Sequence, residues 1–169
     1  MTLDDIKLHI NHYHKNNQTI TALYWLLKKF KLKTKNLKCF SFREAATPNF
    51  ILMTTEGAFG ERQVVKIPEN TFEFSLELML TMLAHELVHV SQKTVLPFVF
   101  DKNEREWQAY YEMLFHKIYP KIPDISNFHK KNFCIKALIY YNLMGENSSL
   151  QAKYLSQKKE IDLLLISVT

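Results

Sequence analysis

The sequence predicts an α+β fold that is mainly helical, in one domain covering residues 1–169. The chain is 47% apolar and contains only 3 Gly and 5 Pro, a composition typical of a compact, helix-rich protein. Its length allows a sizeable core without disulfides. Apolar residues recur with helical spacing in several long segments, and three short β-prone runs stand between residues 37 and 67. We therefore expect a small sheet with helical N- and C-terminal parts.

The N-terminal part is expected to form two helices, over residues 3–15 and 18–31. The second has an apolar stripe with helical spacing, made of Ile20, Leu23, Tyr24, Leu27 and Phe30. A lysine cluster overlaps its end and consists of Lys28, Lys29, Lys31, Lys33, Lys35 and Lys38. Such a cluster can attract nucleic acid, an anionic membrane surface or an acidic protein. We favour a solvated helix end, because lysines there complement the helix dipole and no Gly-rich loop or arginine lies nearby.

The three β-prone runs cover residues 37–42, 50–55 and 62–67, and they predict a three-stranded antiparallel sheet. The last two runs are joined by residues 56–60, which hold two of the 3 glycines in the chain. This arrangement is typical of a β-hairpin. Pro68 is expected to end the sheet, which therefore precedes the helix that carries the main motif.

The motif helix is predicted over residues 72–90, with fraying near Lys93. Asn70 stands three residues before Glu73, a spacing that predicts a capping box at the helix start. The helix is apolar nearly all round, as expected for a helix buried in a protein core. Charged residues interrupt it too often for a membrane span, so we expect no membrane insertion.

This helix contains His85-Glu86-Leu87-Val88-His89, a His-Glu-x-x-His motif. Imidazoles at positions i and i+4 lie on one helix face, so both can reach the same metal ion. Glu86 is turned about 100° away from the first histidine, where it can take a proton from metal-activated water. Core histidines satisfied by hydrogen bonds are the less favoured alternative, because each unpaired polar side chain there would cost roughly 1 to 3 kcal/mol.

Three further helices are expected after the motif. Asp101 and Glu104 have the spacing of a second capping box, which opens a helix that runs to about Lys117. Another helix is predicted over residues 129–144, and Ser148 or Ser149 begins the last one. The chain therefore has a second helix close behind the motif helix.

Catalytic zinc needs three protein ligands and an open position for water. A third histidine of the His-x-x-Gly-x-x-His type is absent, because residues 90–96 read Val-Ser-Gln-Lys-Thr-Val-Leu. Glu104 and Glu106 are the carboxylates that stand on the next helix. We prefer Glu106, because Glu104 is expected to cap the helix and because Ala109, on the face of Glu106, allows close packing. Glu104 remains the alternative metal ligand.

The two cysteines and the N-terminus bear on the compartment. Cys39 and Cys134 have no Cys-x-x-Cys spacing and are expected to be reduced and buried. Residues 1–5 are acidic, where a secretory signal would be basic. The sequence therefore predicts a cytoplasmic protein.

The motif His85-Glu86-x-x-His89 followed by Glu106-Trp107-Gln108-Ala109 resembles the gluzincin zinc metallopeptidases. The small sheet before the motif helix is similar to that of the compact minigluzincins, whose edge strand aligns an extended peptide. The resemblance covers about residues 50–116. It implies a zinc-dependent peptidase with a peptide or protein substrate, in which His85, His89 and Glu106 bind Zn²⁺. Glu86 would be the general base that activates the zinc-bound water.

The chain departs from the gluzincin pattern at Tyr110, where that family often has an aspartate that orients a ligand histidine. A tyrosine hydroxyl is expected to accept the imidazole proton instead. The resemblance also implies a His, Tyr or Arg near the zinc that stabilises the oxyanion. The candidates for this role are Tyr110, Tyr111, His116 and His129.

Two other functions stay open at the level of sequence. One is a regulatory protease that acts on nucleic-acid-associated proteins, with the lysine cluster attracting the partner; salt-dependent DNA binding would indicate it. The other is a non-catalytic interaction protein that zinc stabilises, for which a Glu86→Gln variant would change no activity.

Overall fold

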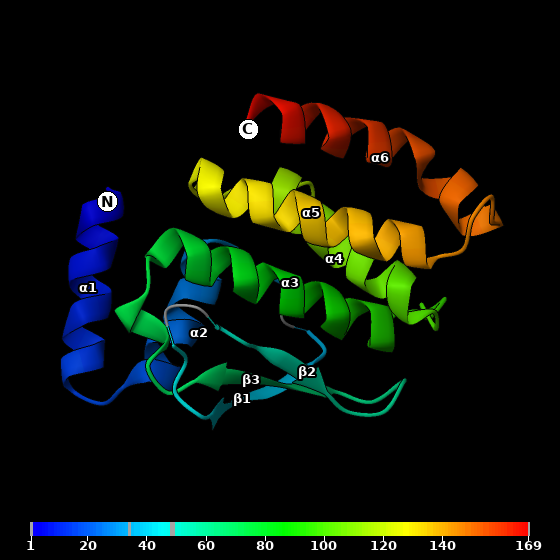
Figure 1. Ribbon diagram of the computed structural model, residues 1–169. Helices are drawn as coiled ribbons and strands as arrows, with labels where there is room; N and C mark the ends of the chain where they lie inside the picture. The colour runs from blue at the N-terminus through cyan, green and yellow to red at the C-terminus, as the bar shows by residue number, and fades with distance from the viewer. Residues whose placement is uncertain (1, 34, 48–49, 169) are drawn as a thin grey trace.

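The structure, a computed structural model, describes residues 2–33, 35–47 and 50–168. It confirms a mainly helical α+β fold, in which the sheet, α3, the α4–α5 pair and α6 follow one another as layers (Figure 1). The helices and strands of the described residues are α1 (Leu3–Lys15), α2 (Thr19–Lys29), β1 (Leu37–Arg43), β2 (Thr54–Glu56), β3 (Gln63–Pro68), the 3-10 turn η1 (Thr71–Glu73), α3 (Leu76–Thr94), α4 (Lys102–Phe115), α5 (Asn127–Leu143) and α6 (Ser149–Ser167).

The sheet has the strand order β1-β3-β2, with β3 in the centre. The predicted hairpin is present, because β2 pairs with β3 in antiparallel orientation. The prediction of a wholly antiparallel sheet was wrong, because β1 pairs with β3 in parallel orientation. The physical reason lies in burial, because Val65 and Ile67 of β3 are fully buried, which suits a central strand. The segment 44–53, which joins β1 to β2, has enough residues to pass from one side of β3 to the other.

The motif helix α3 begins later than predicted, after Ser75. The hydroxyl of Ser75 accepts a hydrogen bond from the backbone N–H of Leu78, at 3.3 Å. Asn70 does not cap α3, because residues 71–73 form the separate turn η1. The Asn70 side chain instead exchanges two hydrogen bonds with the backbone of Ala46, so it ties the loop after β1 to the end of the sheet.

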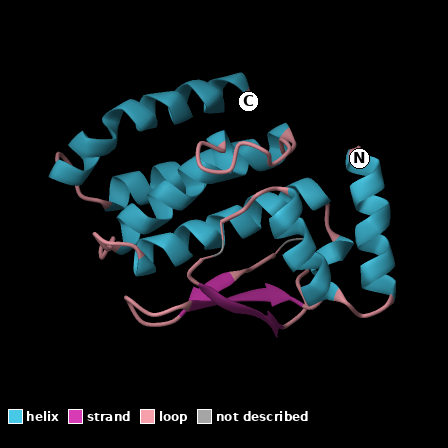
Figure 2. Cartoon of the chain, turned by 180° about the vertical axis from the view of Figure 1, so that it is seen from behind, coloured by secondary structure: helices cyan, strands magenta, loops and turns pink. Residues whose placement is uncertain are grey.

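Helix α3 lies between the sheet and α4 and is buried on both sides (Figure 2). Its residues Leu83, Ala84 and Leu87 belong to the main core, together with Val65 and Ile67 of β3. The polar side chains of the motif therefore stand inside a packed interior, where each of them needs a partner.

Helices α4, α5 and α6 share a second apolar cluster centred on Trp107, which is fully buried. Cys134 lies in this cluster as a buried free thiol, as expected, whereas Cys39 is only half-buried. Across the parts of the chain that the structure describes, no helix combines the length and the apolar character needed to cross a membrane. The second cluster fixes α4 on the side that faces away from α3.

Candidate metal centre

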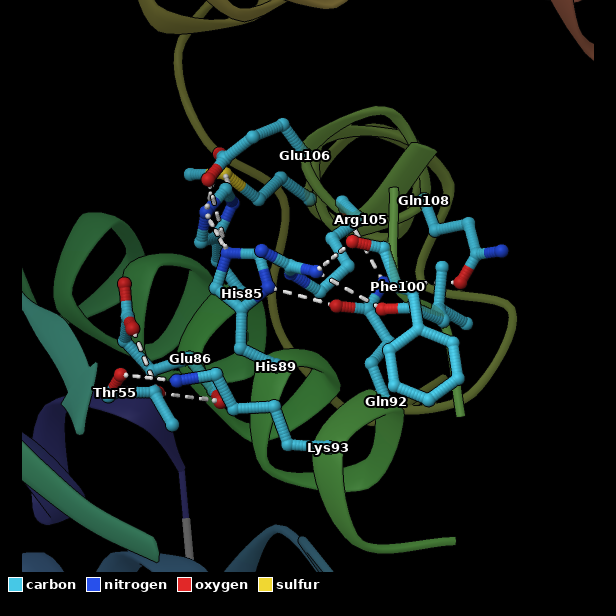
Figure 3. Close-up of polar contacts among 12 residues, drawn as sticks. Thr55, His85, Glu86, His89, Gln92, Lys93, Phe100, Arg105, Glu106 and Gln108 are labelled. Carbon is cyan, nitrogen blue, oxygen red and sulfur yellow. Dashed lines mark hydrogen bonds and ion pairs between the residues drawn. The ribbon is translucent and has the colours of Figure 1, made fainter. Parts of the chain in front are cut away.

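Two helices bring together three side chains that could hold a metal ion. His85 and His89 come from α3, and Glu106 comes from the first half of α4, which packs against α3 (Figure 3). Their ligand atoms all lie within 4.8 Å of one another. The close approach of the helices depends on Ala109, which is fully buried three residues beyond Glu106.

The separations between these atoms fit a tetrahedral metal site. The two Nε2 atoms of His85 and His89 are 3.0 Å apart. The Glu106 carboxylate oxygens lie 3.5 Å from the Nε2 of His85 and 3.6 Å from that of His89. A tetrahedral zinc ion with bonds of about 2.0–2.1 Å places its ligand atoms roughly 3.3 Å apart. The three residues therefore have the spacing of a zinc ligand set.

The hydrogen bonds of Gln92 fix the tautomer of His89. The Gln92 Nε2 donates to the backbone carbonyl of Arg105, at 3.0 Å, and a carbonyl can only accept. The Gln92 Oε1 therefore faces His89, where it accepts from the Nδ1 at 2.8 Å. Because the proton of the imidazole is on Nδ1, its Nε2 presents a lone pair toward Glu106.

The same reasoning applies to His85. Its Nδ1 lies 3.1 Å from the Met113 sulfur, a weak acceptor, so the Nδ1 carries the proton and the Nε2 presents its lone pair. Two lone pairs and a carboxylate then face one another, an arrangement that a cation stabilises and that neutral side chains alone do not. The donor set fits zinc.

The pKa values of the site show the same attraction for positive charge. Burial opposes the charged forms of both His89 and Glu106. Even so, the contact with Glu106 and the charge of Glu86 raise the pKa of His89. The two imidazoles in turn hold the pKa of Glu106 well below its usual range. The raised pKa of His89 and the lowered pKa of Glu106 both show that negative charge gathers around the two imidazoles, where a cation is stabilised.

Glu104, the alternative ligand, lies away from this group. Its carboxylate accepts hydrogen bonds from Lys153, at 2.7 Å, and from the Tyr154 hydroxyl, at 2.6 Å. Both partners are on α6. Two residues of α-helix correspond to a turn of about 200°, so Glu104 and Glu106 point to opposite sides of α4. Asp101 caps α4 as predicted, but Glu104 binds α6 instead of completing the capping box.

A hydrogen-bonded chain connects His89 with Glu104. Gln92, which accepts from His89, donates to the Oε1 of Gln108 at 2.9 Å. The Gln108 Nε2 faces the Tyr154 hydroxyl at 2.6 Å, and that hydroxyl donates to Glu104. Each donor of this hydrogen-bonded series points toward Glu104. Helix α6 thus supports the orientation of an imidazole on α3.

Glu86 is buried beside the candidate ligands, on the side of the sheet. Its Oε2 accepts a hydrogen bond from the Thr55 hydroxyl, at 2.8 Å. The backbone carbonyl of Thr55 in turn accepts from the Lys93 ammonium, at 3.0 Å. These contacts, visible in Figure 3, join β2 to α3. The second carboxylate oxygen of Glu86 makes no hydrogen bond to the part of the chain that the structure describes, so it can accept one from a water molecule.

The three candidate ligands and Glu86 line a cavity of about 440 Å³. The residues that line it are Ile51, Leu52, Met53, Thr54, Thr55, Met82, His85, Glu86, His89, Lys93, Lys102, Arg105, Glu106, Tyr110, Met113, Phe133 and Tyr140. Tyr110 lies beside the candidate ligands, with its ring centroid 4.8 Å from that of His85. Its hydroxyl does not accept a hydrogen bond from an imidazole as expected, because the Nδ1 of His85 donates to Met113 and the Nδ1 of His89 donates to Gln92.

The other three oxyanion candidates lie outside the lining of the cavity. Tyr111 is turned about 100° from Tyr110 on α4, and its hydroxyl donates to Glu160 on α6 at 2.9 Å. His116 ends α4 in a left-handed conformation with φ 47° and is buried there. His129 stacks on Phe133 in α5. Only Tyr110 of the four therefore contacts the site.

Three residues that hold the site were not predicted from the sequence, namely Gln92, Met113 and Thr55. For Gln92 a signal existed, because a residue three positions after His89 lies on the same helix face. Met113 and Thr55 come from other elements, so their positions depend on how the helices and the sheet pack.

Comparisons with protein-family models, with curated proteins and with solved structures returned no match to this chain. The assignment therefore depends on the residues and their geometry.

The two glutamates of α4 form a matched pair for a metal-binding test. We expect Glu106→Gln to weaken zinc binding more than about a hundredfold, since even a lost partner behind a ligand costs roughly 10- to 100-fold. Glu104→Gln should leave zinc affinity close to wild type and lower the free energy of unfolding by about 1 kcal/mol. Chelator competition and urea denaturation measure the two quantities. Equal zinc affinities in the two variants would contradict the assignment.

The role of Gln92 can be separated from a general effect on folding. Gln92→Leu removes the acceptor for the His89 proton and should weaken zinc binding about 10- to 100-fold. Gln92→Glu keeps an acceptor for His89 but loses the two hydrogen bonds that Gln92 donates to Arg105 and Gln108, so it should retain more of the affinity than Gln92→Leu and less than the wild type. Gln157→Leu is the control, because Gln157 bonds the Trp107 indole away from the site. Chelator competition on all three variants is the measurement, and equal losses in Gln92→Leu and Gln157→Leu would refute the role.

Proposed function

We propose that this protein is a zinc-dependent metallopeptidase. The observation that carries the proposal is the position of Glu86 in the same cavity as the His85, His89 and Glu106 group, as a buried carboxylate with one oxygen that bonds no described residue. A structural zinc site is normally closed by four protein ligands, whereas a catalytic one has three and leaves a position open. Three ligands beside a general base in an open cavity favour hydrolysis.

The residues of the site divide the steps of this reaction among them. Zinc bound by the three ligands would lower the pKa of a coordinated water toward about 7 and polarise the scissile carbonyl. Glu86 accepts the proton of the attacking water and passes it to the leaving amine. Thr55 holds one oxygen of Glu86 in place, so that the other faces the water.

Tyr110 is the residue that we assign to the oxyanion. Burial, together with the charges of Glu106, Tyr140 and Glu86, raises its pKa well above the usual range, so the phenol keeps its proton. No residue in the described chain makes a hydrogen bond with its hydroxyl, which can therefore donate to a developing negative charge. Its ring is held between those of His85 and Tyr140.

A peptide substrate fits the surroundings of the site. β2 is an edge strand of the sheet, and residues 51–55, which end in β2, line the cavity. Edge strands bind extended peptides through main-chain hydrogen bonds. The lysine cluster of residues 28–38 contributes nothing to the cavity lining, so we do not extend the proposal to nucleic-acid-associated substrates.

The Glu86→Gln variant tests the proposal. It removes the general base but no metal ligand, so zinc affinity should stay unchanged and kcat should fall about 10²- to 10⁴-fold. The measurement is hydrolysis of a mixture of unstructured peptides, followed by mass spectrometry. Glu77→Gln is the control, because Glu77 lies on the same helix but pairs with Lys7 outside the cavity. A wild type with no more activity than Glu86→Gln would contradict a peptidase function.

A further inference from the structure

The cavity has two chemically different ends. Helices α3 and α4 run antiparallel along it, as the contacts of His85 with Met113 and of Gln92 with Arg105 show. One end is apolar and aromatic, with Met82, Tyr110, Met113, Phe133 and Tyr140. The other end is cationic, with Lys93, Lys102 and Arg105. The three candidate metal ligands and Glu86 lie between the two ends.

The cationic end has no acidic partner of its own. Among the described residues that line the cavity, Glu86 and Glu106 are the only carboxylates. Both are assigned to the reaction. The charge of Glu56 also acts on Lys93, but Glu56 is ion-paired with Lys66 at 2.8 Å. In the described chain, none of the three cations takes part in an ion pair. A bound zinc ion would balance the two glutamates, so three positive charges remain.

Two of these cations are held in place and still have donors to offer. The Arg105 Nη1 donates to the carbonyls of Val99 and Phe100, while its Nε and Nη2 make no hydrogen bond to the described residues. Lys93 uses one donor on the Thr55 carbonyl and keeps two. The half-buried Lys93 has a lowered pKa because of burial and the nearby Arg105 charge. An anion placed there would gain fixed donors and relieve this repulsion.

We infer that the cationic end binds a carboxylate of the peptide substrate, about two residues from the scissile bond. Lys93 lies one helical turn beyond His89, roughly 6 Å along the axis, which is the length of about two residues of extended chain. The carboxylate belongs to an Asp or Glu side chain or to a free C-terminus. The inference rests on the proposed function, because it takes the cavity as a peptide groove.

Affinity selection from randomised peptides tests this without requiring turnover. The zinc-loaded Glu86→Gln chain is exposed to two pools, one with amidated and one with free C-termini, and the retained peptides are sequenced by mass spectrometry. We expect Asp and Glu to exceed Asn and Gln about fivefold at one position, the upper contribution of a half-exposed ion pair. Retention from the free pool alone would identify the C-terminal carboxylate as the group bound.

Two charge reversals complete the test. Adding Lys102→Glu should abolish the acidic preference, whereas adding Lys136→Glu, on the exposed face of α5 outside the cavity, should leave it intact. Equal retention of acidic and neutral peptides in both pools, or no retention, would overturn the inference. Failure of the wild type to cleave any peptide, despite acidic enrichment, would count against the proposed function alone.

Discussion

Two imidazole lone pairs and a carboxylate meet at one point inside this protein, and a cation is what makes such a meeting favourable. The hydrogen-bond partners of the Nδ1 atoms determine the tautomers: Gln92 accepts from the Nδ1 of His89, and Met113 accepts from the Nδ1 of His85. Glu106 then completes a set of three acceptors with tetrahedral spacing. A helix as buried as α3 can carry these polar side chains only if they are compensated together.

The rest of the fold can be understood as support for this arrangement. Ala109 lets α4 approach α3, and the Trp107 cluster fixes the opposite side of α4 against α5 and α6. The hydrogen-bonded chain through Tyr154 carries the restraint from α6 to the imidazole on α3. The sheet contributes Thr55, which orients Glu86. Residues far apart in the sequence thus determine the geometry of one short motif.

Local patterns in the sequence predicted the helices, the motif and Glu106, because helical spacing and capping act over a few residues. Strand order and the partner of Glu104 could not be predicted in this way. The parallel pairing of β1 depends on which strand is central, and Glu104 binds Lys153 and Tyr154 across about fifty residues of chain. Packing between distant segments decides such features, and no local pattern encodes it.

The central claim is that His85, His89 and Glu106 bind zinc, and a crystal structure of the zinc-soaked protein tests it most directly. Anomalous diffraction at the zinc absorption edge locates the metal independently of the protein atoms. We expect one strong peak about 2.0–2.1 Å from both Nε2 atoms and from a Glu106 oxygen. A peak at another place, or an empty site at saturating zinc, would contradict it.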